Sequence, residues 1–131
     1  MKKPKTSAKN IINRRARFDY ELGDELVAGM SLRGVEVRAV RDGRVSLKGA
    51  FVTLRNGRKG EELWLNNASF SLKNQGEGIS KSDTIDTSPK KLLATRKQIE
   101  NFSSQKKAGF TIVPVKILAE GRFIKIVIAL G

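Results

Sequence analysis

Cysteine and histidine are both absent from this 131-residue chain. Without them the protein can form no disulfide, no thiolate or imidazole metal site, no cysteine nucleophile and no histidine acid–base pair. Long apolar runs are missing as well. None approaches the ~20 residues of a membrane-spanning helix, and Met1-Lys2-Lys3-Pro4-Lys5 leads into polar residues rather than a signal-peptide core. We therefore expect a cytoplasmic protein that uses no metal or cofactor and no membrane.

Acidic residues are scarce relative to basic ones. The chain has 13 Asp and Glu against 26 Lys and Arg, a formal net charge of +13. Internal pairing cannot neutralise this excess, so a polyanionic partner is expected, with nucleic acid ahead of an anionic membrane. Residues 1–17 hold seven cations and no acid, and acids follow within 19–25. This switch predicts a basic flexible arm over 1–12 and a single folded domain over 13–131.

Groupings of side chains typical of enzymes are also missing. Asp24-Glu25 and Glu61-Glu62 are adjacent pairs, and neighbours in a strand point to opposite faces rather than converging on a substrate. Gly76-Glu77-Gly78 has neither the preceding strand nor the following helix of a phosphate-binding or dinucleotide-binding loop. The sequence therefore favours a binding protein over an enzyme.

Period-2 alternation and turn residues predict several strands. Alternating apolar residues over 24–32 indicate a half-buried strand, and a short strand is expected at 45–48. Residues 51–55 and 61–65 form a predicted hairpin, with Asn56-Gly57 supplying the positive φ angles of its turn.

The segment 33–42 fits a strand or a helix. We favour a helix ended by Gly43, with Leu32, Val35 and Ala39 facing the core. Arg38 and Arg41 are three residues apart and would share another face, free for a ligand.

A long loop is expected over about 71–88, because the segment is rich in Gly, Ser, Thr and Asp and has no period. Ser88-Pro89 then resembles a hydroxyl N-cap followed by proline, and predicts a helix that ends before Gly109. Its core stripe would be Leu92, Ile99 and Phe102. Lys90 and Lys97 would lie on the opposite face.

Two β-branched runs, 110–118 and 122–130, close the chain as strands. Pro114 cannot donate to a sheet ladder, so an edge or a bulge is expected there. About six short strands with two to three helices predict a mainly β fold, a six-stranded antiparallel OB-type barrel. The aromatic residues Phe51, Trp64 and Phe70 fit core positions better than base-stacking platforms.

Four motifs stand in register along the chain. They are Asn13-Arg14-Arg15-Ala16-Arg17-x-Asp19-Tyr20, Leu32-x-Gly34-x-Glu36-Val37-Arg38-x-Val40-Arg41-x-Gly43, Lys90-Lys91-Leu92-Leu93 and Gly109-Phe110-Thr111-Ile112-Val113-Pro114-Val115-Lys116. Their order and spacing closely resemble the small protein B family, the tmRNA (SsrA RNA)-binding proteins of bacterial trans-translation, over about residues 10–131.

That resemblance implies an OB-type barrel adaptor. Members bind the elbow of the tRNA-like domain of tmRNA and deliver it to stalled ribosomes, so the implied partners are tmRNA and the ribosome, at its small-subunit decoding region and its large subunit. A monomer is expected. With Lys97 added from the helix-face argument, the implied RNA-binding residues are Asn13, Arg14, Arg15, Arg17, Tyr20, Glu36, Arg38, Arg41, Lys90, Lys91, Leu93 and Lys97. Arginine forks suit phosphates, and a folded RNA is recognised mostly by its shape and backbone.

Some positions depart from the family pattern or stay open. Phe18 stands where the family usually has His, and Val27 where it often has Glu. Glu36 either accepts a hydrogen bond from a base edge or ribose hydroxyl, or holds a nearby arginine. Family members continue past this region with a lysine-rich tail, whereas this sequence ends at Gly131. The alternative function is a general RNA- or ribosome-binding OB module without preference for tmRNA.

Overall fold

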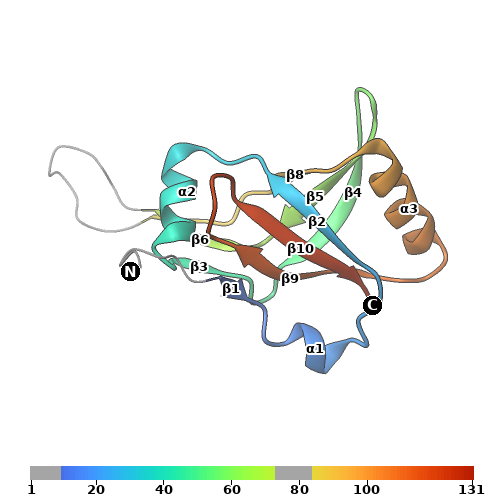
Figure 1. The fold of residues 1–131 in the computed structure, drawn as a ribbon, viewed down its shortest axis with the longest axis horizontal. Coiled ribbons are helices and arrows are strands. Elements are labelled where there is room, and N and C mark those ends of the chain that lie inside the picture. The colour runs from blue at the N-terminus through green and yellow to red at the C-terminus, as the bar shows by residue number, and fades with distance from the viewer. Residues whose placement is uncertain (1–9, 73–83) are drawn as a thin grey trace, which may run out of the picture.

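The computed structural model describes residues 10–72 and 84–131, and strands dominate it (Figure 1). The strands are β1 (Ile11–Ile12), β2 (Glu25–Met30), β3 (Val45–Ser46), β4 (Phe51–Gly57), β5 (Gly60–Asn66), β6 (Ser69–Leu72), β7 (Thr84–Asp86), β8 (Lys90–Leu93), β9 (Ile112–Leu118) and β10 (Lys125–Leu130). The helices are α1 (Ala16–Asp19), α2 (Gly34–Arg41) and α3 (Arg96–Lys107). The prediction of a mainly β fold with helices is confirmed.

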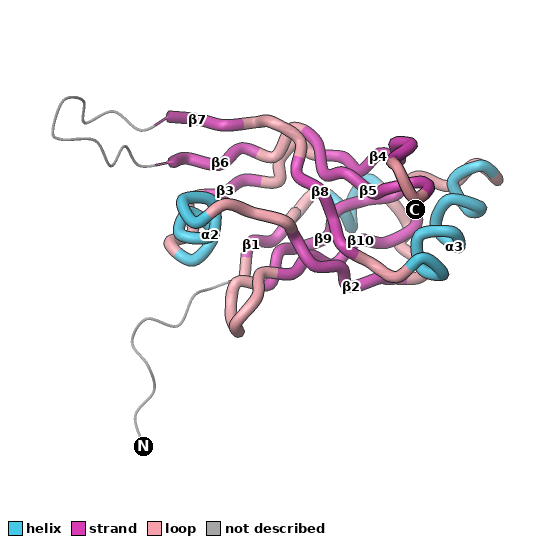
Figure 2. Tube along the Cα trace, turned by 90° about the horizontal axis from the view of Figure 1, so that it is seen from above, coloured by secondary structure: helices cyan, strands magenta, loops and turns pink. Residues whose placement is uncertain are grey.

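Most of the strands form one curled antiparallel sheet. Its order is β1-β9-β10-β2-β8-β5-β4, and β3, β6 and β7 pair in a smaller sheet. The long sheet curls until β4, at one edge, approaches β9 near the other. The result is a half-barrel filled by apolar side chains that alternate inward along the strands. Helices α2 and α3 lie at opposite ends of it, against β6 and β5 respectively (Figure 2).

The folded part begins before the predicted domain boundary. Ile11 and Ile12 pair with Ile117 and Lys116 of β9, so the last two residues of the predicted arm belong to the sheet. Asn10 accepts a hydrogen bond from the Ala119 amide at 3.1 Å, and the rest of that arm, residues 1–9, lies outside the described residues. The sheet edge offered by β9 explains the correction, because a two-residue strand has no readable period of its own.

Strand β2 and helix α2 form where they were predicted. Leu26, Ala28 and Met30 are buried while Val27 is exposed, as the alternation required. The helical alternative for 33–42 is confirmed, but its predicted core stripe was partly wrong. Val35 is exposed, and the buried positions of α2 are Glu36, Ala39 and Val40.

The β4–β5 hairpin is longer than predicted, and its turn is displaced. Asn56 pairs with Glu61, and Gly57 with Gly60, so Asn56-Gly57 continues strand β4. The turn falls on Arg58 and Lys59, and the positive φ belongs to Gly60 at 124°. The backbone pairing of Asn56 with Glu61 outweighs the preference of asparagine for turns.

The segment 71–96 corrects two predictions. Ser71 and Leu72 belong to β6 and Thr84–Asp86 form β7, so the ends of the predicted loop are paired strands, while 73–83 lie outside the described residues. Residues 90–93 form β8 between β2 and β5 rather than the first turn of a helix. Helix α3 begins only after Thr95, whose hydroxyl accepts from the Gln98 amide at 3.1 Å while the Gln98 side chain accepts from the Thr95 amide.

Strand β9 carries the irregularity predicted at Pro114. Val127 pairs with Lys116 and Ile128 with Pro114, so Val115 is an extra residue opposite β10. Of the aromatic residues assigned to the core, Phe70 is fully buried, Trp64 is half-buried and Phe51 is exposed. No helix among the described residues is long and apolar enough to cross a membrane.

Candidate nucleic-acid interface

Asn13 anchors the first motif to the bulge of β9. Its side-chain amide donates to the Pro114 carbonyl at 2.7 Å, and its backbone amide donates to the Val115 carbonyl at 2.8 Å. The side-chain oxygen of Asn13 accepts a hydrogen bond from the backbone amide of Arg15 at 3.2 Å. Asn13 is therefore used to position the chain that enters α1, rather than presented to a ligand.

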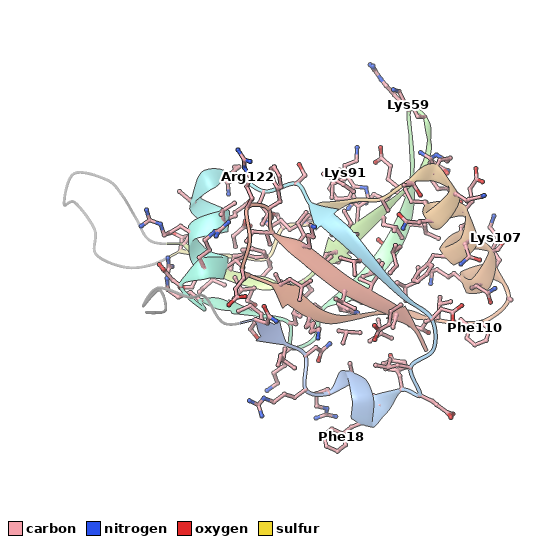
Figure 3. The ribbon with its side chains drawn as sticks, viewed as in Figure 1. Phe18, Lys59, Lys91, Lys107, Phe110 and Arg122 are labelled. Carbon is pink, nitrogen blue, oxygen red and sulfur yellow. The ribbon has the colours of Figure 1, made fainter. Side chains whose placement is uncertain are left out.

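The cations beside Asn13 are exposed. Arg14 and Arg15 project from the turn before α1, and Arg15 makes a loose ion pair with Asp19 at 3.6 Å. The side chain of Arg17 lies outside the described part of the structure. Tyr20 is 40% exposed and Phe18 is 85% exposed. Phe18 points away from the sheet at the lower edge of Figure 3.

A groove of about 470 Å³ runs beside this motif. Arg15 and Tyr20 line it together with Lys48 and Phe51, and Pro114 is among the β9 residues that complete it. We call the exposed residues Arg14, Arg15 and Tyr20, together with this groove, the α1 surface. It presents arginine, lysine and aromatic side chains from three separate parts of the chain.

The two arginines predicted to bind a ligand from α2 have different environments. Arg38 is exposed, as predicted. Arg41 instead donates to the carbonyls of Gly121 and Arg122 at 2.9 and 3.2 Å, and so holds the connection between β9 and β10. Arg41 is therefore only partly free for a ligand, because a loop 80 residues away in sequence engages one of its guanidinium nitrogens.

Glu36 and Lys90 form a buried charged pair beneath the surface. They are 3% and 4% exposed, and the Lys90 ammonium lies 2.8 Å from Glu36 Oε2. The same ammonium donates to Asp86 Oδ2 at 2.6 Å and to Ser88 Oγ at 3.0 Å. All three of its hydrogens thus have acceptors, and none remains for a phosphate. The predicted exposure of Lys90 was wrong.

Arg33 completes the network from the surface side. Its backbone amide donates to Glu36 Oε1 at 2.8 Å and its guanidinium to Oε2 at 2.9 Å, so Glu36 does hold a nearby arginine. Burial raises the pKa of Glu36, but the hydrogen bonds from Lys90 and Arg33 outweigh it and the pKa lies below its usual value. The pKa of Asp86 is lowered in the same way, against burial, by hydrogen bonds from Lys90 and Ser88. Both carboxylates are ionised near neutrality.

Strand alternation turns Lys91 and Leu93 outward where Lys90 and Leu92 turn inward. Lys91 pairs with Glu62 at 3.2 Å, and Leu93 is 50% exposed. Leu93 pairs with Gly29 and Gly29 with Lys125, which places an exposed lysine in the same row across three strands. The motif comparison missed Lys125, because one lysine before a β-branched run carries no signal. We call Lys91, Leu93, Lys125 and the exposed Val27 the strand surface.

The predicted site residues therefore fall into separate groups. The α1 surface adjoins β9 at the lower side of the sheet in Figure 1, whereas β8 runs along the upper side of the same sheet. Lys91 and Arg122 lie along the upper edge in Figure 3. Lys97 is exposed in the first turn of α3, at the end of the sheet away from α2. Within residues 10–72 and 84–131, no cluster of acidic side chains is suited to hold a metal ion.

Comparison with known proteins agrees with the motifs. The family model described as "SmpB protein" matches residues 10–131. The SsrA-binding protein of Enterococcus hirae is 39% identical over 130 residues, covering 98% of this chain and 80% of that protein. The SsrA-binding protein of Ligilactobacillus salivarius is 38% identical, with 98% and 79% covered.

A solved structure shows the same fold. Its description is "tmRNA-SmpB: a journey to the center of the bacterial ribosome", and one of its chains superposes with a TM-score of 0.68 at 30% identity, covering 94% of this chain and 82% of its own. The family match spans all of the described residues and so includes both surfaces. This chain belongs to the SmpB protein family.

Proposed function

We propose that this protein binds the tRNA-like domain of tmRNA and delivers it to stalled ribosomes, as a cytoplasmic adaptor for ribosome rescue and not as an enzyme. One observation carries the proposal: family membership over residues 10–131, among relatives that are SsrA-binding proteins. The structural neighbour comes from a tmRNA complex described on the bacterial ribosome, which supports the same two partners.

The geometry supports an adaptor because the basic residues face more than one direction. The α1 surface and the strand surface lie on different sides of the half-barrel, so one molecule has room for two RNA contacts. Exposed arginines at the first surface suit phosphates, and a folded RNA is recognised largely through its backbone and shape. The formal charge of +13 favours both contacts.

We also propose the finer description of the fold, a single OB-type domain built on a six-stranded barrel. The run β9-β10-β2-β8-β5-β4 supplies six strands, and the approach of β4 to β9 supports its closure. Of the proposed RNA contacts, Arg14, Arg15, Arg38, Lys91, Leu93 and Lys97 are best supported, because they are accessible to a ligand. Asn13, Glu36, Arg41 and Lys90 would act by positioning the others.

The test is a titration against the folded tRNA-like domain of tmRNA, with ordinary tRNA as competitor, at two salt concentrations. We expect tight binding that ordinary tRNA displaces poorly. Equal displacement by any RNA would support the general RNA- or ribosome-binding module instead.

A matched pair of variants assigns the binding to the first motif. Each phosphate contact contributes about 0.9 to the slope of log affinity against log salt, so R14Q/R15Q should lower that slope by about 2. K106Q/K107Q removes the same charge from the exposed last turn of α3 and should leave the slope unchanged.

A further inference from the structure

A second cavity, of about 460 Å³, lies between the tip of the β4–β5 hairpin and the start of α3. Four cations line it: Arg58 and Lys59 from the hairpin turn, Lys91 from β8 and Arg96 from α3. Figure 3 shows Lys59 at the end of the hairpin, which projects well beyond the sheet. The sequence motifs identified Lys91 among these residues but neither the hairpin pair nor Arg96.

Glycine at two positions lets the walls of this cavity approach. Gly60 has a φ of 124°, and a Cβ there would lie 3.1 Å from the Arg96 guanidinium. A Cβ at Gly57 would overlap the Glu62 carboxylate. Arg96 donates to the Glu61 carbonyl at 2.8 Å, which fastens the hairpin to α3. The hairpin and the helix that carry the cations are therefore already held together in the free protein. This lowers the conformational entropy that would be lost when a ligand binds.

The charge of the cavity is unbalanced. Among the described residues that line it, Glu62 is the one acid, and Lys91 at 3.2 Å and the Trp64 indole N–H at 3.2 Å already engage it. Four cations against one carboxylate leave an excess of three positive charges. Because like charges gathered at one place repel one another, this arrangement favours a bound anion.

Helix α3 adds a second reason. The structure describes the whole first turn of α3, which contains Arg96 and Lys97 and no acidic residue. Cations there oppose the positive end of the helix dipole, a small cost that a neighbouring anion would relieve. A bound phosphate would be compatible with both the cations and the helix end.

We propose that this cavity binds the phosphate backbone of RNA, and so extends the strand surface towards the hairpin tip. Leu93 belongs to the strand surface and also lines the cavity. Together with Ile99 it gives the cavity an apolar part that fits a sugar or base beside the phosphates. Arg58 and Arg96 supply guanidinium forks and Lys59 and Lys91 supply point charges. This inference rests on the proposed function, because it names further contacts to the same RNA.

The experiment compares R58Q/K59Q with K106Q/K107Q in full-length protein, using the tRNA-like domain of tmRNA as probe. Both variants remove two positive charges from exposed positions, and Figure 3 places Lys107 at a distance from Lys59. We expect R58Q/K59Q to reduce the salt slope by about 1 to 2. Affinity should fall about tenfold, as expected for loss of one charge-assisted hydrogen bond. The α3 control should behave like the wild type.

Lysine footprinting gives an independent readout. Bound RNA should protect Lys59 and Lys91 from acylation and leave Lys107 reactive. Equal affinity and slope for the two variants, or Lys59 that stays reactive in the complex, would overturn the cavity proposal while wild-type binding still supports the adaptor. If the wild type does not bind the RNA at all, the adaptor proposal and this one both fail.

Discussion

Lys90 and Lys91 are adjacent in β8, but their side chains lie on opposite faces of the sheet and have different roles. Lys90 is buried, and its ammonium has three acceptors and lies 4.9 Å from the centre of the Phe70 ring. Lys91 faces outward from the same strand and pairs with Glu62 at the surface. A buried ion pair that loses one partner leaves an uncompensated charge, whereas an exposed pair contributes little.

We therefore predict opposite outcomes for the two lysines. K90M should lower the free energy of unfolding by roughly 3–5 kcal/mol, because the buried Glu36 and the partly buried Asp86 would both lose the Lys90 ammonium. K91M should change it by at most about 1 kcal/mol and weaken RNA binding instead. Urea unfolding followed by circular dichroism, with RNA titration of the folded variants, separates the two. Similar stability losses for both variants would contradict the burial argument.

The same network predicts an acid-sensitive stability. The pKa values of Glu36 and Asp86 are lowered in the folded protein, so their contribution is fully present above their ordinary pKa near 4 and is lost as pH falls below it. D86N should be less stable than the wild type at neutral pH and should lose less on acidification. Urea midpoints measured from neutral pH to about pH 3 test this. D24N, at an exposed position, is the control, and parallel curves for D86N and wild type would contradict the prediction.

At the scale of elements, an irregularity in strand β9 positions helix α1. The extra residue at Val115 turns two β9 carbonyls towards Asn13, which holds the chain just before α1. Helix α1 has four residues and no side-chain N-cap, so it is too short to be stable alone. The orientation of Arg14 and Arg15 therefore depends on the bulge in β9.

N13A should release this helix. Loss of the side-chain bond to Pro114 should cost about 1 kcal/mol of stability. The amides of Asp19 and Tyr20, bonded to Arg15 and Ala16, should exchange faster with solvent. N101A, on the exposed face of α3, serves as the control. Unchanged exchange in α1 would show that other contacts hold the helix.

At the scale of the whole molecule, the fold spreads a large positive charge over separate surfaces. Mutual repulsion among these charges destabilises the compact state, and salt screens it. We predict that the unfolding free energy rises between about 0.01 M and about 0.15 M NaCl, where the Debye length falls from ~30 to ~8 Å. K59E/K97E, which lowers the net charge from +13 to +9 (13 − 4), should show a smaller rise. A salt response equal to that of the wild type would contradict the prediction that the charges of Lys59 and Lys97 contribute to this repulsion.

Sequence patterns predicted elements whose signal is local. The alternation in β2 and the β-branched runs of β9 and β10 lie within the strands that they predict, and the stop signal Gly43 lies two residues after the end of α2. The prediction failed at 88–95, where Ser88-Pro89 resembled a helix start. Partners on β2 and β5 drew Lys90–Leu93 into the sheet, and the capping box at Thr95 began the helix instead.

The sequence by itself determined the chemistry of this protein: no thiol or imidazole, a net charge of +13, and the motif order that its family shares. Tertiary structure alone decided which basic residues face a ligand. Lys90 and Arg41 look as available as Lys91 and Arg38 in the sequence, but Glu36 and the Gly121 carbonyl occupy the first two. Those partners lie 54 and 80 residues away, and contacts at such separations exist only after the sheet has curled and the buried charges have found their counterparts.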